Sequence, residues 1–141
     1  MTDVVVDAST TLAWCFPDEA SDYADDVLVS LGGKTIFVPA VWRLEVANAI
    51  LVGERRKRLS PGDVARFMSL LDSLSIVEDA QPLSEHVRSV LPLAKKYELS
   101  AYDAAYLELA IRRRSSLAAF DGKLRRAAQK AGVKIFAGSA H

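Results

Sequence analysis

Short apolar runs alternate along the chain with longer stretches in which apolar residues recur every three or four positions. The runs Val4–Val6, Thr35–Val38 and Ile76–Val77 are too brief for helices and are rich in β-branched residues, which favours buried strands. The runs Leu117–Phe120 and Val133–Phe136 have the same character, and the last is expected at a sheet edge. This alternation predicts an α/β protein whose strands form a parallel sheet with right-handed crossovers.

Helices are expected between these strands. In chain order they are a short helix from Ala8 towards Pro17, a helix over 20–31, a long helix after Pro39, one from Pro61, one from Leu83, one over 101–113 and one over 124–131. The long helix is expected from the spacing of Val41, Leu44, Ala47 and Leu51. Pro92 lies inside the helix from Leu83 and is expected to kink or split it.

Composition limits the classes of protein that the chain can represent. Its 141 residues fit one domain covering 1–141, and 50% hydrophobic with 26% charged residues is typical of a globular protein. Eighteen basic residues balance eighteen acidic ones, so any contact with a polyanion must be local. A single cysteine, Cys15, lies in an apolar run and is expected in the core. Without a membrane span or signal-peptide start, the chain is expected in the cytoplasm.

Four acidic residues stand where an α/β protein exposes polar groups. Asp7 and Asp121 follow strands directly, Asp103 lies in the first turn of the helix that opens after Ser100, and Glu45 projects from the long helix. Ligands of open parallel sheets bind outside the carboxyl ends of the strands, so all four acids are expected on one rim. Taken singly, Asp103 could be the acid of a capping box, Asp121 a helix N-cap, and Glu45 a solvated helix position.

Convergent carboxylates repel one another unless a cation neutralises them. Oxygen ligands without histidine or cysteine favour Mg²⁺ or Mn²⁺, which orient a phosphodiester and activate a bound water. His86 within a helix and His141 at the chain end have no spaced partner for a zinc site or a nucleophilic triad. The glycine fingerprints of nucleotide-binding loops are also missing from the sequence.

The segments VVVDAST, PAVWRLEVANAI, LSAYDAAYLELA and AAFDGKLRRAAQKAGVKIF together resemble the PIN-domain family, in particular the VapC-like toxin ribonucleases of type II toxin–antitoxin pairs. The resemblance covers Asp3 to Phe136. It implies a three-layer α/β/α fold with a mainly parallel sheet of four to five strands. It also implies an endoribonuclease dependent on Mg²⁺ or Mn²⁺, with an RNA substrate, a cognate antitoxin and a homodimeric state.

Carried over by position, the family's acidic quartet corresponds to Asp7, Glu45, Asp103 and Asp121. Asp7 and Asp103 are then the expected main metal ligands, and Glu45 and Asp121 complete the site directly or through water. Ser9 matches the hydroxyl residue that helps to hold the first acid, and Asn48 matches a polar neighbour. The basic residues near these motifs are candidate RNA contacts: Arg112, Arg113, Arg114, Lys123, Arg125 and Arg126. Tyr102 and Tyr106 are favoured as core residues, although aromatic rings there could stack on bases.

Two other functions remain open from the sequence. A non-catalytic module of the same fold could use its acidic pocket to bind a partner's arginine. A phosphohydrolase could use Asp7 as nucleophile, although that chemistry usually needs a second acid where this chain has Ser9.

Overall fold

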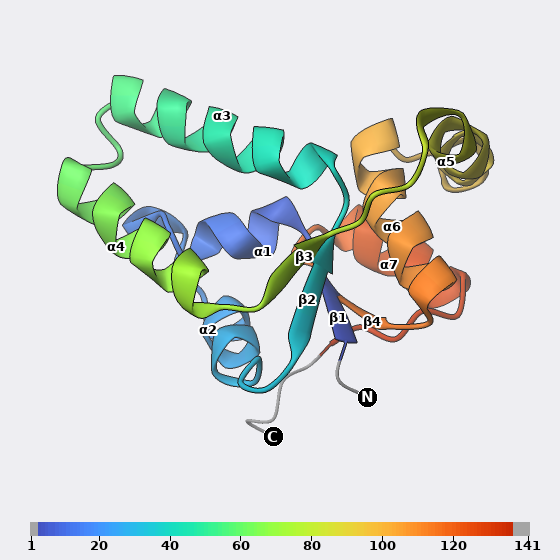
Figure 1. Ribbon diagram of the computed structural model, residues 1–141, viewed down its shortest axis with the longest axis horizontal. Helices are drawn as coiled ribbons and strands as arrows, with labels where there is room; N and C mark the ends of the chain where they lie inside the picture. The colour runs from blue at the N-terminus through green and yellow to red at the C-terminus, as the bar shows by residue number, and fades with distance from the viewer. Residues whose placement is uncertain (1–2, 137–141) are drawn as a thin grey trace.

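A four-stranded parallel sheet forms the centre of the protein (Figure 1). The computed structural model describes residues 3–136. The strands pair in the order β3-β2-β1-β4, so the N-terminal strand lies inside the sheet, and the predicted parallel α/β fold is confirmed. The four strands are β1 (Asp3–Val6), β2 (Thr35–Val38), β3 (Ile76–Glu78) and β4 (Ser116–Ala118).

Helices cover both faces of the sheet, as expected of a three-layer α/β/α fold (Figure 1). One side carries α1 (Ala8–Ala13), α2 (Asp22–Val29), α3 (Val41–Arg55) and α4 (Pro61–Ser73), with a short 3-10 helix at Pro17–Glu19 between α1 and α2. The other side carries α5 (Leu83–Tyr97), α6 (Ala101–Arg113) and α7 (Gly122–Lys130).

Successive side chains of β1 point to opposite faces of the sheet, so this strand contributes to the apolar cluster on each face. Val5 belongs to the apolar cluster formed with α6 and α7, whereas Val4 and Val6 pack in a second cluster with Val27 of α2. All three valines are 2% exposed or less, which is why this strand consists entirely of apolar residues after Asp3. No helix in the described part of the chain is both long and apolar enough to cross a membrane.

One prediction about secondary structure was wrong, and one of two alternatives for another element is excluded. The expected strand Val133–Phe136 is reduced to an isolated parallel bridge between Ile135 and Leu117, so the described sheet has four strands. The helix from Leu83 is not split, because α5 continues through Pro92 to Tyr97. A proline removes one hydrogen bond from a helix, and the remaining turns and the packing of Val90 keep α5 as one element.

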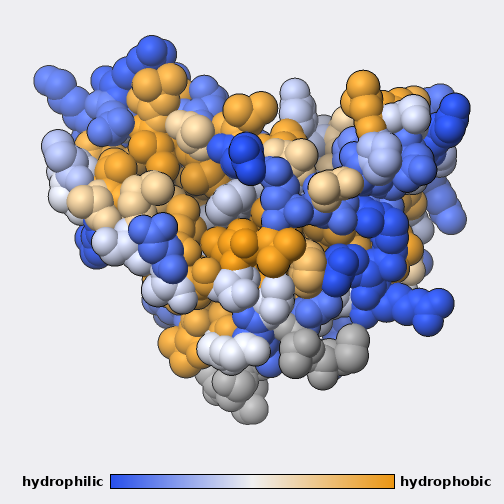
Figure 2. Space-filling model, in the orientation of Figure 1, coloured by the Kyte–Doolittle hydropathy of each residue, from blue (hydrophilic) through white to orange (hydrophobic). Residues whose placement is uncertain are grey.

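The sequence indicated the right helix but the wrong buried face for α3. Leu44 is 69% exposed and Leu51 is 44% exposed, whereas Val46 and Gly53 are buried. Cys15 is buried in the cluster that Val46 joins, as expected. Apolar side chains of α3 therefore remain on the surface, and Figure 2 shows apolar areas in the regions of α3 and of α5.

Gly53 is required where α3 packs closely against the side chains of Phe16 and Leu59. A Cβ at this position would lie 2.7 Å from two ring carbons of Phe16 and 2.9 Å from Leu59 Cδ1. We expect Gly53→Ala to lower the free energy of unfolding by about 1–3 kcal/mol through overpacking, measured by urea denaturation. Gly62→Ala is the control, because its Cβ would meet only Ser60 Oγ at 3.7 Å. Equal stability of the two variants would contradict this assignment.

Candidate active site

Asp7 is placed at the carboxyl end of β1 and begins α1. Its carboxylate accepts hydrogen bonds from the Thr10 backbone N–H at 2.9 Å and from Ser9 Oγ at 2.8 Å. Its own N–H donates to Ala118 O at the end of β4 at 3.0 Å, which ties the residue to the neighbouring strand. Burial raises the pKa of Asp7, these hydrogen bonds oppose the rise, and the charge of Asp103 adds to it.

Glu45 reaches the same region from the second turn of α3. The Tyr106 hydroxyl donates a hydrogen bond of 2.6 Å to Glu45 Oε1. Burial raises the pKa of Glu45, this hydrogen bond opposes the rise, and the charges of Asp103 and Asp7 strengthen it. Glu45 therefore has one oxygen fixed by a buried tyrosine and lies within electrostatic reach of two other acids.

Asp103 lies in the first turn of α6, whose N-cap is Ser100 as predicted. The Ser100 side chain accepts from the Asp103 N–H at 3.1 Å. In α4 the corresponding Asp63 returns a side-chain bond to Ser60, but no such return bond from Asp103 is present in the described structure. The capping-box explanation is therefore not sufficient for Asp103. Burial and the charge of Asp121 raise its pKa, and Lys123 lowers it.

Asp121 follows β4 and begins α7. Its Oδ2 accepts a hydrogen bond of 2.9 Å from the Leu124 N–H, so the N-cap alternative is correct as far as it goes. Asp121 is exposed and its other carboxylate oxygen has no hydrogen bond among the described residues. The N-cap uses one carboxylate oxygen of Asp121, and the negative charge of Asp121 raises the pKa of Asp103.

The topology explains why these four acids lie towards the same edge of the sheet. The chain places β2 and β3 on one side of β1 and β4 on the other, so β1 and β4 flank the point where the strand order reverses. Asp7 and Asp121 follow those two strands. Helix α6 runs back to the start of β4, so it begins at the carboxyl edge, where it presents Asp103. The charge of Asp103 raises the pKa of Asp7 and of Glu45, and the charge of Asp121 raises the pKa of Asp103.

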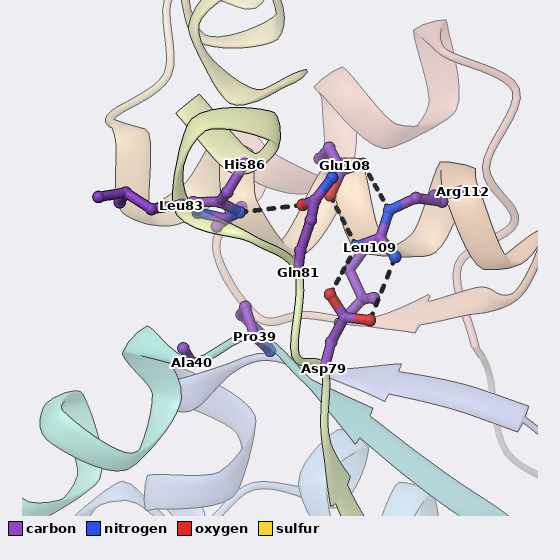
Figure 3. A pocket seen from close by; sticks show the side chains of 10 residues that line it. Pro39, Ala40, Asp79, Gln81, Leu83, His86, Glu108, Leu109 and Arg112 are labelled. Carbon is purple, nitrogen blue, oxygen red and sulfur yellow. Dashed lines mark hydrogen bonds and ion pairs between the residues drawn. The ribbon is translucent and has the colours of Figure 1, made fainter. Parts of the chain in front are cut away.

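None of these four acids forms an ion pair with a residue in 3–136. Other acids of the protein do. Glu108, only 6% exposed, and Asp79 both bind the guanidinium of Arg112 in the neighbouring pocket of Figure 3, with distances of 2.7–3.1 Å. The acids in the pocket of Figure 3 are thus neutralised by Arg112, whereas Asp7, Glu45, Asp103 and Asp121 have no ion-pair partner in the described residues.

The donor set suits a hard divalent cation, because it consists of carboxylate oxygens and holds no imidazole or thiol. It is not a preformed cage: no group of three His, Cys, Asp or Glu side chains in residues 3–136 is arranged to hold a metal ion. Carboxylates that repel one another separate when no cation lies between them. An ion at this site would therefore draw the side chains together.

The supporting residues differ in their placement. Ser9 contacts Asp7 directly, as the resemblance implies, whereas Asn48 is exposed on α3. Tyr106 is 1% exposed and was correctly expected in the core, but its contact with Glu45 was not anticipated from the sequence. Its position three residues after Asp103 on a helix could have signalled this role, since such positions share a face. Tyr102, favoured as core, is 60% exposed.

The candidate RNA contacts separate into two groups. Arg112, Arg113 and Arg114 lie at the far end of α6, about 15 Å along the helix from Asp103. Arg113 contacts Asp3 Oδ2 at 3.3 Å, at the start of β1 and the opposite edge of the sheet. The structure therefore does not bring these three arginines to the acids, although they are close in sequence.

The basic residues of α7 lie on the side of the acids. Lys123 affects the pKa of Asp103, and Lys123 and Arg126 are exposed. Arg125 is held internally, because its Nε donates to Ala119 O at 2.7 Å and its guanidinium lies 4.5 Å from the centroid of the Tyr23 ring.

The fold is an α/β/α domain with a parallel sheet, and its candidate site is a group of carboxylates at the switch point of that sheet. The sequence has no glycine-rich nucleotide-binding loop, so the class of protein is an α/β/α domain with an acidic site. The chain belongs to the PIN-domain family, whose family model matches residues 4–130. PIN domains are in general nucleases that use divalent metal ions.

Solved structures agree with this assignment. PAE2754 from Pyrobaculum aerophilum is similar over 89% of this chain and 79% of that one, with 25% identity and a TM-score of 0.65. FitAcB from Neisseria gonorrhoeae has the same fold over 94% of this chain and 96% of that one, with 15% identity and a TM-score of 0.63. No curated protein matches the chain.

Removing the Tyr106 hydroxyl tests its role in positioning Glu45. We expect Tyr106→Phe to shift the acidic limb of the pH profile of catalysis to higher pH, because the lost hydrogen bond no longer opposes the rise in the pKa of Glu45. Activity at neutral pH should fall about tenfold. Tyr102→Phe on the same helix is the matched control, since that side chain is exposed. An unchanged pH profile in Tyr106→Phe would argue against this role.

Proposed function

We propose that this protein, as a single PIN domain over 1–141, is a metal-dependent endoribonuclease and the toxin of a VapC-like toxin–antitoxin pair. The observation that carries the proposal is the cluster of four acids without an ion pair in the described chain, at the sheet's switch point, in a family of nucleases. The sequence resemblance over Asp3 to Phe136 supports the narrower toxin assignment.

Each acid has a distinct position in the proposed reaction. Asp7 and Asp103 would be the main ligands of Mg²⁺ or Mn²⁺, with Glu45 and Asp121 completing the site directly or through water. The bound ion would supply charge stabilisation at the phosphodiester and a water of lowered pKa. Ser9 and the Thr10 N–H fix the orientation of Asp7, and Tyr106 fixes that of Glu45. No side chain is required as a covalent nucleophile.

The proposed partners are an antitoxin and a second copy of the chain. Exposed apolar side chains on α3 and α5 support protein partners, since Leu44, Leu83 and Leu91 are 69%, 80% and 47% exposed. A cytoplasmic location is part of the proposal and is compatible with the free, buried Cys15.

The proposal is tested with purified protein and a pool of structured RNAs, with the new RNA ends mapped by sequencing. We expect cleavage at a small set of sites with Mg²⁺ or Mn²⁺ and none with excess EDTA. Cleavage that continues in EDTA would exclude the metal-dependent mechanism. Co-purification with the product of a neighbouring small gene, and loss of cleavage in that complex, would test the toxin assignment.

A second candidate is a binding module whose acids receive a partner's arginine. The absence of a preformed metal-binding group in residues 3–136 favours it, because an arginine would also compensate the four acids. Calorimetric titration distinguishes the two. Binding of Mn²⁺ that is lost in Asp103→Asn supports the nuclease, and no binding of either Mn²⁺ or Mg²⁺ supports the module.

A further inference from the structure

A groove between the end of α5 and the exposed side of α7 has an unusual concentration of positive charge. Its lining includes four basic residues and one acid, namely Lys96, Lys123, Arg126, Lys130 and Glu98, together with Tyr97. The whole chain is electrically balanced, with eighteen basic and eighteen acidic residues. The excess is therefore local to this α5–α7 groove.

The cations of this groove have no ion-pair partner in the described part of the chain, and Lys96 Nζ lies 5.4 Å from the centroid of the Tyr97 ring. None of the four forms a salt bridge to a described residue, in contrast to Arg43, Arg58 and Arg112. All four are exposed. The neighbouring Arg125 differs, because its Nε donates a hydrogen bond to Ala119 O. Helix α7 therefore carries one arginine that is bound within the fold and three basic residues that line the groove.

The three basic residues of α7 form one line. Lys123, Arg126 and Lys130 are spaced by three and four residues, so they share a side of the helix over about 10 Å. A single line of cations follows one phosphate backbone, whereas a duplex presents two. The geometry therefore favours a single strand.

The line leads directly to the acid cluster. Lys123 belongs both to the groove and to the surroundings of Asp103, whose pKa it lowers. A Cβ at Gly122 would lie 3.1 Å from an Arg126 guanidinium nitrogen, so this guanidinium folds back beside the start of α7, next to Asp121. Lys123 and the start of α7 therefore connect the groove to the surroundings of Asp103 and Asp121.

We propose that the α5–α7 groove binds the phosphates of a single-stranded nucleic acid on one side of the bond that is cut. This inference rests on the proposed ribonuclease function and adds the path of the substrate, including Lys96 and Lys130. The path leaves Asp103 along α7 and does not include Arg112, Arg113 or Arg114, which lie at the far end of α6.

The test measures binding without catalysis. A fluorescein-labelled 16-nucleotide single-stranded RNA is titrated in EDTA with wild type, with Arg126→Gln/Lys130→Gln, and with the control pair Arg55→Gln/Arg56→Gln. The control pair removes the same charge from exposed arginines at the end of α3. Melting temperatures confirm that all three proteins are folded.

We expect the groove pair to weaken binding about tenfold at 100 mM salt and to reduce the slope of log K against log salt by about 1.4, or about 0.7 for each lost phosphate contact. The control pair should stay within about twofold of wild type. Single-stranded DNA of the same sequence should show the same loss, since the groove recognises phosphate. Unchanged binding of the groove pair, or an equal loss in the control pair, would overturn the proposal.

A second readout separates this proposal from the function on which it rests. Hydrolysis of bis(p-nitrophenyl) phosphate with Mn²⁺ reports on the acid site with a substrate too short to follow the groove. Groove-dependent RNA binding without hydrolysis of either substrate would retain the binding site and reject the nuclease. Hydrolysis of RNA by the groove pair with an unchanged KM would retain the nuclease and reject the groove.

Discussion

Replacing Asp103 by asparagine is expected to reduce metal-dependent RNA cleavage by about 10³-fold, because it removes a proposed main ligand of the ion that stabilises charge at the phosphodiester. The same variant should have a higher melting temperature than wild type without metal. Burial and the nearby Asp121 raise the pKa of Asp103, which means that its charged form is unfavourable in the metal-free fold. Cleavage assays and calorimetry measure the two effects.

The control for this experiment is Asp63→Asn in α4. Asp63 occupies the same position relative to a serine N-cap as Asp103 does in α6, but its carboxylate accepts a hydrogen bond of 2.9 Å from the Ser60 N–H. Asp63→Asn should lower the melting temperature and leave cleavage unchanged. If both variants lose stability and keep activity, Asp103 is a structural cap and the nuclease proposal fails.

Local sequence signals determined much of the fold. The run Thr35–Val38 has the observed strand boundaries, and the Ser100 cap correctly predicted a helix over Ala101–Arg113. Asp7 and Asp121 could be placed at the carboxyl edge because each directly follows an apolar run, and in a parallel sheet such ends share one edge. These features depend on residues that are neighbours in the chain.

Features that depend on tertiary packing could not be predicted from the local sequence. Helix α3 has apolar residues on more than one side, and its contacts with α1 and α4 decide that Val46 is buried and Leu44 is not. Arg112 is near Asp121 in sequence, but it lies at the far end of α6 from Asp103, and Asp79 and Glu108 bind its guanidinium. The bond from Tyr106 to Glu45 joins residues that are 61 positions apart.

Stabilisation by Mn²⁺ is expected to grow strongly with pH. Burial is the main cause that raises the pKa of Asp7, Glu45 and Asp103 above the ordinary values of 3.8 for Asp and 4.5 for Glu. A group with a raised pKa in the folded state contributes stability below its unfolded pKa, and this contribution is lost as the pH rises through the folded pKa. These three acids should therefore destabilise the metal-free protein progressively as the pH rises above about 4.

Metal binding has the opposite dependence, because the ion needs ionised carboxylates. At a Mn²⁺ concentration about 100 times Kd, linkage gives about 2.7 kcal/mol, or roughly 10 °C in melting temperature for a domain of this size. We expect the difference between melting temperatures with and without Mn²⁺ to rise from near zero at about pH 4 to this value at about pH 7. The pKa values of Asp18 and Asp63 are lowered. Their contribution to stability is the same with and without Mn²⁺, so it cancels in the difference between the two melting temperatures. A difference that is constant across this range would contradict metal binding by these acids.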